Sequence, residues 1–360
     1  MEQFLCKTKI ISGAGAAASL KEVGSKRLLM VADPYFTANG QAQRIASLAG
    51  AEATELFDRV TPDPSVELAA EGTSCVRKFQ PDTIVALGGG SAIDCAKAMA
   101  YFTEDRITLV VIPTTSGSGS EVTDFAILTH DGVKHPLVDE KIQPDLAILD
   151  SDLLKELPKS LVADAGFDVL AHAAESFVAT GAGVISDALA ADAFSAAFAL
   201  LPASFAGRIE VRQRIHMASA MAGMAFSQSG LGLCHAMSHV LGGMFHVPHG
   251  RLNAILLPAV IDCNAHGAAA KYAKLARSAG LGGSADTLGV RNLKNALVRL
   301  RRELGLPQTL AQAGIKPQEV WHRSKEIVAA TLHDPCCKTN PVLVEDFMVR
   351  KILEEVSGRV

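Results

Sequence analysis

Side chains that can bind a metal ion occur in pairs at helical spacing in the second half of the chain. Asp168 and His172 stand four residues apart in GFDVLAHAAE, and His235 and His239 repeat this spacing in GLGLCHAMSHVLGG. His249 follows in VPHG. Residues four apart on a helix point to the same face, so each pair can reach one ion. The spacing therefore predicts a metal site in a helical part of the protein.

The clustered histidines lie in a segment without charged residues. From Ile215 to Gly250 the chain contains no Asp, Glu, Lys or Arg. A membrane span is the alternative for such a length, but its histidines, serines and Gln228 would be costly in lipid. A buried protein core with a polar centre fits the composition better. An isolated histidine is more often a packed core residue, and we interpret the others nearby in this way: His216, His246 and His266.

The chain between His235 and His249 must turn back. In one straight helix, the two residues would be about 21 Å apart at 1.5 Å per residue. Metal–ligand bonds are about 2 Å long, so the two side chains could not share an ion across that distance. Gly242-Gly243 and Pro248 are the residues that we expect to break the helix.

Two loops rich in glycine and hydroxyl groups follow apolar segments in the first half of the chain. Gly88-Gly89-Gly90-Ser91 ends one strand-like segment, and Pro113 to Glu121 (PTTSGSGSE) follows the next. A glycine loop before a helix lets a phosphate approach free backbone N–H groups. The spacing GxGxxG is absent, and a simple turn is the alternative. Two such loops at the carboxyl ends of parallel strands favour a dinucleotide site, with Asp33 either on a ribose diol or as a helix cap.

These residues require two kinds of domain to position them. Short β-rich apolar segments alternate with amphipathic ones up to residue 150, which predicts βαβ units and a doubly wound parallel sheet. The expected strands are 27–33, 82–90, 108–115 and 145–150, the expected helices are 41–48, 65–79 and 92–101, and 124–138 is an expected β-hairpin that turns at Asp131-Gly132. From 151 to 360 the apolar spacing is helical throughout. We therefore expect a dinucleotide-binding α/β domain over 1–150 and an all-helical metal and substrate domain over 151–360.

Composition excludes several classes of protein. The 360 residues carry a net charge of −4, which gives no electrostatic basis for binding nucleic acid or an anionic membrane. The seven cysteines are scattered without a CxxC pair, so we expect neither a disulfide framework nor a thiolate zinc site. The first twenty residues lack a continuous apolar stretch. A cytoplasmic protein is the expected class.

The motifs resemble, in order and nearly end to end, those of the iron-containing (group III) alcohol dehydrogenases. They are GGGSAIDCAK, PTTSGSGSEVT, GFDVLAHAAESF, GMAFSQSGLGLCHAMSHVLGG, VPHGRLNAILLP and the late TNP at 339–341. The resemblance implies a fold of the dehydroquinate synthase type, with a Rossmann-like N-terminal domain. It implies Asp168, His172, His235 and His249 as metal ligands, with His239 beside the metal. It places NAD on Asp33, Gly88, Gly89, Gly90, Ser91, Asp94, Thr114, Thr115, Ser118 and Lys134, and it puts Asp63 where many members have Asn near the nicotinamide ribose.

The resemblance also implies an activity. The central motif and TPDPS (61–65) look closest to the short-chain alcohol dehydrogenases of bacterial microcompartment operons, the 1-propanol dehydrogenase type. The expected reaction interconverts a short primary alcohol and its aldehyde with NAD(H). Donor chemistry suits Fe²⁺ or Zn²⁺ almost equally, and the resemblance favours iron. A homodimer or larger homo-oligomer is expected.

Three alternatives remain open at this stage. One is a glycerol or diol dehydrogenase of the same fold. Another is a dehydroquinate synthase-like lyase, although the charge-free segment argues against a polyanionic substrate. The third is a non-catalytic partner of a protein shell. For His239 we expect a proton-transfer role, because an imidazole can take up and release a proton near neutral pH, with packing as the alternative.

Overall fold

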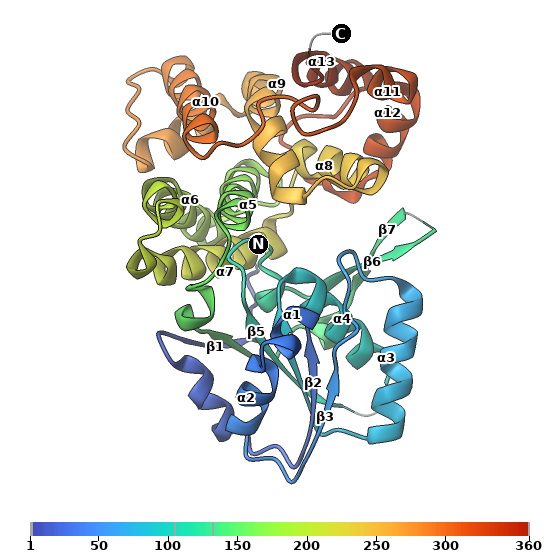
Figure 1. The fold of residues 1–360 in the computed structure, drawn as a ribbon. Coiled ribbons are helices and arrows are strands. Elements are labelled where there is room, and N and C mark those ends of the chain that lie inside the picture. Colours follow the sequence, from blue (N-terminus) through green and yellow to red (C-terminus); the bar gives the residue numbers. More distant parts are fainter. Residues whose placement is uncertain (1–2, 104–105, 132, 359–360) are drawn as a thin grey trace. The chain divides into compact units, whose positions relative to one another are not determined.

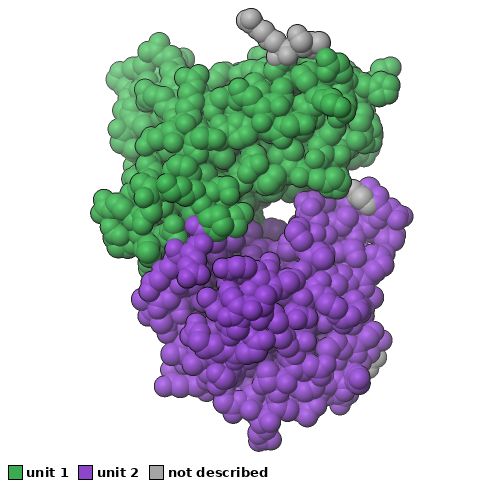
Figure 2. Space-filling model, in the orientation of Figure 1, with its two compact units in different colours: residues 1–4, 158–360 green, residues 5–157 purple. Residues whose placement is uncertain are grey.

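The computed structural model describes residues 3–103, 106–131 and 133–358, and the chain divides into two compact units (Figure 2). Residues 5–157 form an α/β unit. The chain from Pro158 onward, with the first few residues, forms a helical unit. The sequence pattern changes at Asp150, whereas the units divide between Leu157 and Pro158.

A six-stranded parallel sheet is the centre of the α/β unit. Its strand order is β1-β8-β5-β4-β2-β3, with every neighbouring pair parallel. The strands are β1 (Lys9–Ser12), β2 (Arg27–Ala32), β3 (Ala53–Phe57), β4 (Thr83–Gly88), β5 (Thr108–Pro113) and β8 (Leu146–Leu149). The expected doubly wound sheet is thus confirmed. The edge strands β1 and β3 were not predicted, because their short sequences KIIS and ATELF are only partly buried and carry no continuous apolar segment.

Alternating side chains of the buried strands face two helical layers. On one face, Leu28 and Met30 share a core with Leu20 and Ile45. The opposite face is covered by helices that contact β3, β4 and β5 (Figure 1). The first layer contains η1 (Ala16–Val23), α1 (Pro34–Ala38) and α2 (Gln41–Leu48), and the second contains α3 (Val66–Phe79) and α4 (Gly90–Tyr101).

The chain reverses its direction of travel across the sheet between β2 and β4. From β2 it adds β3 on one side, and it then returns to place β4 on the other side. Ligands of open α/β sheets bind at such a switch point, beyond the carboxyl ends of the strands. Asp33 follows β2, and Gly89 follows β4. The topology therefore brings two of the expected cofactor residues to this edge.

The expected β-hairpin is present as a separate two-stranded sheet. Strand β6 (Phe125–His130) pairs antiparallel with β7 (Val133–Val138). Of the turn dipeptide Asp131-Gly132, Gly132 lies outside the described residues, and Asp131 has a positive φ of 49°. Short 3-10 turns complete the unit: η2 (Ser120–Val122), η3 (Glu140–Ile142) and η4 (Ser151–Leu154).

The helical unit is built around α5 (Lys159–Val178), whose second half is buried on all sides. Three helices pack against it: α6 (Val184–Phe205), α7 (Arg212–Ser229) and α9 (His249–Ser278) (Figure 1). The other helices are α8 (Leu233–Phe245), α10 (Asp286–Glu303), α11 (Pro317–His322), α12 (Ser324–His333) and α13 (Asp346–Val356), with 3-10 turns η5 (Ile209–Val211) and η6 (Pro335–Thr339). The expected succession of helices is confirmed.

One helix of this unit is long and apolar enough to cross a membrane. Helix α6 reaches a mean hydropathy of 1.6, and 33% of that window is buried. It packs against α5 and α7, and its Asp187 lies 3.5 Å from Lys271 Nζ. These contacts are typical of a helix that belongs to a folded helical domain.

The turn between His235 and His249 is present, but the residues that make it differ from those expected. Gly242 and Gly243 lie inside α8 and do not break it. Helix α8 ends at Phe245, the next residue His246 has a left-handed φ of 55°, and Pro248 then precedes α9. The prediction that the two glycines break the helix was wrong, because the backbone reverses at a histidine that sequence patterns do not mark as a breaker.

Candidate functional site

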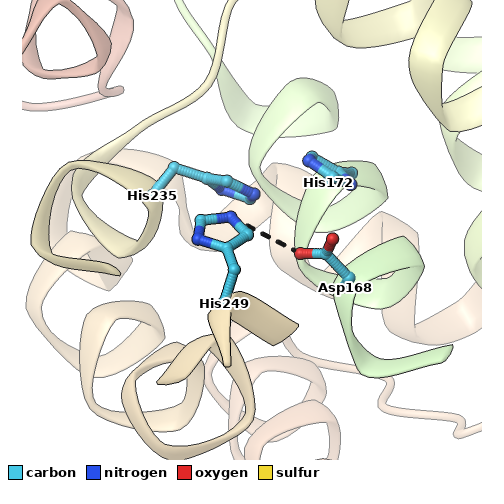
Figure 3. A group of neighbouring side chains, drawn as sticks. All are labelled: Asp168, His172, His235 and His249. Carbon is cyan, nitrogen blue, oxygen red and sulfur yellow. Dashed lines mark ion pairs between the residues drawn. The ribbon is translucent and has the colours of Figure 1, made fainter. Parts of the chain in front are cut away.

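The structure brings four of the expected metal-binding side chains together. One ligand atom from each of Asp168, His172, His235 and His249 lies within 4.8 Å of the others (Figure 3). Helix α5 provides the first two, α8 provides His235, and the first residue of α9 provides His249. Small side-chain rotations would let bonds of about 2 Å reach one ion at the centre. The group therefore fits one divalent cation.

The rings of this site are packed against each other and against Phe226. The His172 ring stacks at 4.4 Å on Phe226 and at 4.4 Å on His235. His249 lies at the more open side, with 28% of its side chain exposed and its Nε2 3.6 Å from Asp168 Oδ1. Burial lowers the pKa of His235 well below its ordinary value, and the nearby His239 adds to this effect. A neutral imidazole has a free lone pair for a metal ion.

Glu175 fixes the orientation of His235. Its Oε2 lies 2.7 Å from His235 Nδ1, and both side chains are almost fully buried. When Nδ1 carries the ring proton and donates a hydrogen bond to this carboxylate, Nε2 is unprotonated. Burial raises the pKa of Glu175 to about 7, although hydrogen bonds from backbone N–H groups oppose that effect.

The same carboxylate caps helix α8. Helix α8 follows Gly232 and has no capping side chain of its own. Glu175 instead accepts hydrogen bonds from the N–H groups of Gly232 at 3.0 Å, Cys234 at 2.7 Å and His235 at 3.2 Å. An acidic group is favourable at a helix N-terminus, where free N–H groups and the dipole meet. Glu175 therefore positions both the helix and the imidazole that it carries.

Asn253 holds the carboxylate of the site. Its Nδ2 donates to Asp168 Oδ1 at 2.7 Å and lies 3.3 Å from His235 Nε2. Its Oδ1 accepts from Ser238 Oγ at 2.5 Å. Asn253 thus links α9 to the ligand-bearing helices α5 and α8.

The start of α9 is locked against α5. Arg251 makes two hydrogen bonds to the Asp164 carboxylate, at 3.1 and 2.8 Å. A Cβ atom on Gly250 would lie 2.0 Å from the carbonyl oxygen of Asp164, so only glycine permits this approach. These contacts place His249 opposite Asp168.

His239 lies beside the four side chains and is paired elsewhere. Its ring stacks at 5.3 Å on that of His249, with an angle of 14° between the planes. Its Nδ1 lies 2.9 Å from Asp334 Oδ2. Although burial alone would raise the pKa of Asp334, the hydrogen bond and charge of His239 bring it below its ordinary value. If Nδ1 carries a proton that it directs at Asp334, Nε2 remains available to take up or release a second proton.

The expected dinucleotide residues of the first glycine loop lie together at the switch point of the α/β unit. A Cβ on Gly88 would lie 2.6 Å from Ala92 Cβ and 3.5 Å from Asp33 Cβ. A Cβ on Gly89 would meet Thr115, and one on Gly90 would meet Ser118, each at 3.2 Å. Ser91 lies in the first turn of α4. The absence of side chains on the three glycines leaves room for a phosphate at the N-terminus of α4.

Asp33 also caps the short helix α1. Its Oδ1 accepts a hydrogen bond from Tyr35 N–H at 2.8 Å. The structure therefore contains the cap that we considered as the alternative to ribose binding. One oxygen of a carboxylate can cap a helix while the other accepts from a ligand.

The remaining expected cofactor residues are held by contacts within the same unit. Thr114 N–H donates to Gly88 O at 2.9 Å, which joins the two loops. Lys134 Nζ lies 2.7 Å from Asp63 Oδ1, so these two residues pair with each other. Asp94 is buried on α4 and accepts from Ile127 N–H at 3.1 Å. Burial raises the pKa of Asp94 to about 6, against the opposing charge of Lys97.

Several residues that shape the metal site were not predicted. Glu175 could have been found, because Asp168, His172 and Glu175 follow helical spacing on one face of α5. Asn253 and the Arg251–Asp164 pair depend on contacts between separate helices, for which local sequence gives no signal. Asp334 and Cys336, which lie near His239, likewise come from the distant segment η6.

Comparison with known proteins gives the family. Residues 7–151 match the family described as iron-containing alcohol dehydrogenase, and residues 162–357 match the C-terminal part of the Fe-containing alcohol dehydrogenase family. The chain is 36% identical to 1-propanol dehydrogenase PduQ of Citrobacter freundii, over 99% of this chain and 100% of that protein. It is also 36% identical to an NADPH-dependent butanol dehydrogenase of Clostridium saccharobutylicum, over 98% of this chain and 97% of the relative.

A solved structure agrees with these matches. The crystal structure of sulfoacetaldehyde reductase from Bifidobacterium kashiwanohense in complex with NAD+ has a TM-score of 0.90 and 27% identity, over 99% of each chain. An α/β unit with a switch-point loop and a helical unit with an Asp/His₃ cluster are the parts of an enzyme that binds a dinucleotide and a metal ion. The chain belongs to the iron-containing alcohol dehydrogenase family. The resemblance of its sequence motifs to that family is confirmed.

Proposed function

We propose that this protein is an iron-dependent dehydrogenase that interconverts short-chain primary alcohols and aldehydes, such as 1-propanol and propanal, with NAD(H). The observation that carries the proposal is the buried group of one carboxylate and three imidazoles, Asp168, His172, His235 and His249. Membership of the family and the 1-propanol dehydrogenase relative support the reaction and the substrate size.

The four side chains would hold the metal ion. When bound, Fe²⁺ acts as a Lewis acid on the substrate oxygen, and NAD(H) exchanges the hydride. Glu175 keeps His235 Nε2 unprotonated for the ion, and Asn253 orients the Asp168 carboxylate. The donors suit Fe²⁺ or Zn²⁺ on chemical grounds, and the family favours iron.

His239 would transfer the proton of the reaction. Reduction of an aldehyde requires one proton at the substrate oxygen for each hydride delivered to carbon. Asp334 accepts from Nδ1, so Nε2 of His239 is the atom that would give the proton and regain it from solvent. With 24% of its side chain exposed, His239 has access to water.

NAD is the proposed cofactor, and the residues at the sheet edge would bind it. Gly88, Gly89, Gly90 and Ser91 would receive the phosphates, with the hydroxyls of Thr114, Thr115 and Ser118 beside them. Asp33 would accept from the ribose diol and repel a 2′-phosphate. The sulfoacetaldehyde reductase complex with NAD+ supports this assignment, and the butanol dehydrogenase named for NADPH makes the cofactor preference a necessary measurement.

We further propose that the protein is a cytoplasmic homodimer or larger homo-oligomer, with association with a bacterial microcompartment. The support is the resemblance of the central motif and TPDPS (61–65) to enzymes of microcompartment operons. Light scattering after size-exclusion chromatography should give at least twice the chain mass. A monomer at micromolar concentration would contradict the oligomer.

The decisive experiment combines metal analysis with a substrate panel. Protein purified without oxygen should hold one iron per chain and oxidise NADH with propanal. The variant His235→Ala should lose both the ion and the turnover. A variant that keeps full metal content and turnover would remove these residues from the ligand set. A higher kcat/KM for glycerol than for propanol would instead assign the enzyme to the diol dehydrogenases. Stable aerobic activity with stoichiometric zinc would show that the native ion is zinc and not iron.

A further inference from the structure

A second group of metal-binding side chains lies next to the first. Among the described residues, one ring nitrogen of His239, an Asp334 carboxylate oxygen and Cys336 Sγ lie within 4.8 Å of one another. His239 comes from α8, while Asp334 and Cys336 stand at the start of η6. The stacking of His239 on His249 makes this group a neighbour of the Asp/His₃ site.

Backbone and side-chain contacts already hold the three residues in place. Asp334 caps η6 by accepting a hydrogen bond from Cys336 N–H at 2.9 Å through Oδ1. Its other oxygen, Oδ2, faces His239 Nδ1 at 2.9 Å. The group is partly buried, with 24% of the His239 side chain and 12% of the Asp334 side chain exposed. An ion from solvent can therefore reach a set of donors that is largely ordered beforehand.

The donor set differs chemically from that of the first site. The group offers nitrogen, oxygen and sulfur, whereas Asp168 and its three histidines offer no sulfur. Imidazole, carboxylate and thiolate are the usual ligands of zinc, and three protein ligands leave one position open. Thiolate selects thiophilic ions over Mg²⁺ and Ca²⁺. One carboxylate and one thiolate also balance the charge of a divalent ion.

Binding would displace two protons from the present hydrogen bonds. Burial and the Asp334 carboxylate raise the pKa of the Cys336 thiol well above its ordinary value, so the thiol is protonated without an ion. A coordinated cysteine loses its proton outright, and that proton goes to solvent. The proton on His239 Nδ1 leaves in the same way, because this nitrogen must offer its lone pair to the ion.

We propose that His239, Asp334 and Cys336 form a second cation site, which takes Zn²⁺ or another thiophilic divalent ion. An ion there occupies His239 Nδ1 and separates it from Asp334. Zinc at this site therefore inhibits the enzyme reversibly, a consequence that rests on the proposed proton-transfer role of His239. The binding itself does not depend on that role.

Cobalt titration of metal-free protein tests the site directly. Co²⁺ bound to a thiolate gives a sulfur-to-metal charge-transfer band in the near ultraviolet, and Co²⁺ bound only to Asp and His does not. We expect the protein to bind two Co²⁺ per chain. The intensity of the charge-transfer band should correspond to one of these two ions. Cys336→Ser should remove the band and one equivalent. One Co²⁺ per chain without the band in the unmodified protein would overturn the proposal.

The adjacent cysteine supplies a matched control. Cys337 Sγ donates to Thr331 O at 3.1 Å and does not belong to the group. Cys337→Ser should therefore keep both the band and the second equivalent. A band that survives in Cys336→Ser, or is lost only in Cys337→Ser, would refute the assignment to Cys336. Circular dichroism of both variants checks that each one is folded.

A further variant separates this proposal from the proposed function. His235→Ala should lose the first equivalent and keep the charge-transfer band, because the first site contributes no sulfur. Zinc added to the iron-loaded enzyme should inhibit it, and Cys336→Ser should need at least about tenfold more zinc for the same inhibition, equivalent to ~1.4 kcal/mol of lost affinity. Equal zinc sensitivity of the two proteins would contradict inhibition through this site.

Discussion

At the scale of single residues, the metal site depends on a carboxylate that is not itself one of the proposed ligands. All the groups around Glu175 are donors: three backbone N–H groups at the start of α8 and Nδ1 of His235. A carboxylate accepts from all of them, whereas a carboxamide would turn an NH₂ group toward at least one N–H. The charge of Glu175 therefore matters for geometry as well as for electrostatics.

Glu175→Gln should weaken metal binding without removing a ligand. We expect the affinity for the ion to fall about 10- to 100-fold, as is usual when the partner of a ligating histidine is lost. Metal content after dialysis against a graded chelator measures the effect. Glu303→Gln, at an exposed position on α10, is the control and should bind metal normally. Unchanged affinity in Glu175→Gln would exclude this positioning role.

His239 should govern turnover more than metal content. His239→Ala should keep the ion and lower kcat by about 10²-fold or more, the usual effect of losing a general acid or base. The pH profile of kcat should also become flatter near neutrality. His322→Ala, on the exposed face of α11, is the control variant. Metal loss in His239→Ala would make His239 a ligand, and near-normal kcat with an unchanged profile would make it a packing residue.

Asp33 should set the preference for NAD over NADP. Replacement removes the negative charge near the proposed 2′-phosphate position, so the preference should narrow by about tenfold, equivalent to ~1.4 kcal/mol. Asp33→Gly also removes the cap of α1, whereas Asp33→Ser keeps a capping oxygen. In both variants, the ratio of kcat/KM with NAD to kcat/KM with NADP should fall by the same factor. Equal use of both cofactors by the unmodified enzyme would exclude this role for Asp33.

At the scale of elements, local sequence pattern predicted most of the strands and helices. The elements and site residues that it did not predict depend on contacts between distant parts of the chain. The buried strands β2, β4, β5 and β8 are short, continuous apolar segments, and the helices of the second unit are longer stretches with few β-branched residues. The edge strand β1 pairs with β8, far along the chain, and its four residues give no pattern of their own. In the same way, the spacing of Asp168 and His172 predicts that they share a helix face, whereas Asn253 and Asp334 reach the site only through tertiary packing.

The stability of the contact between the starts of β2 and β4 should depend on pH, because the Asp82 carboxylate links them. This carboxylate accepts from Ser25, from the N–H groups of Lys26 and Arg27, and from Thr83. Burial alone would raise its pKa, but these hydrogen bonds outweigh burial and bring the pKa below the ordinary value of 3.8. A lowered pKa means that this stabilisation is present above pH 3.8 and is lost as pH falls through the folded-state pKa.

Asp82→Asn should therefore destabilise the protein at neutral pH and much less in acid. Because the carboxyl group is exposed, we expect a loss of about 1 kcal/mol at most at pH 7. Urea unfolding at pH 7 and at successively lower pH measures the difference from the unmodified protein. Asp145→Asn is a poor control because the Asp145 carboxylate accepts a hydrogen bond from Leu109 N–H, so Glu156→Gln, at an exposed position, serves instead. A difference that grows as the pH falls would contradict the assigned direction.

At the scale of the whole molecule, the proposed dinucleotide residues and the proposed iron ligands belong to different units. The expected dinucleotide residues all belong to residues 5–157, and the expected metal ligands all belong to the unit that begins at Pro158. Each unit has its own buried core, as the separate sheet and helix packing indicate. A ligand that binds one unit should therefore stabilise mainly that unit.

Hydrogen exchange followed by mass spectrometry should resolve the two effects. At 100 times its dissociation constant a ligand adds about 2.7 kcal/mol of stability, which slows exchange through unfolding by about 100-fold. Iron or zinc should protect α5, α8 and the start of α9, because these segments carry the proposed ligands. NAD+ should protect the segments around Asp33, Gly88 to Ser91 and Thr114 to Ser118. Protection by NAD+ confined to the helical unit would place the dinucleotide elsewhere, and protection by metal confined to residues 5–157 would refute the Asp/His₃ site.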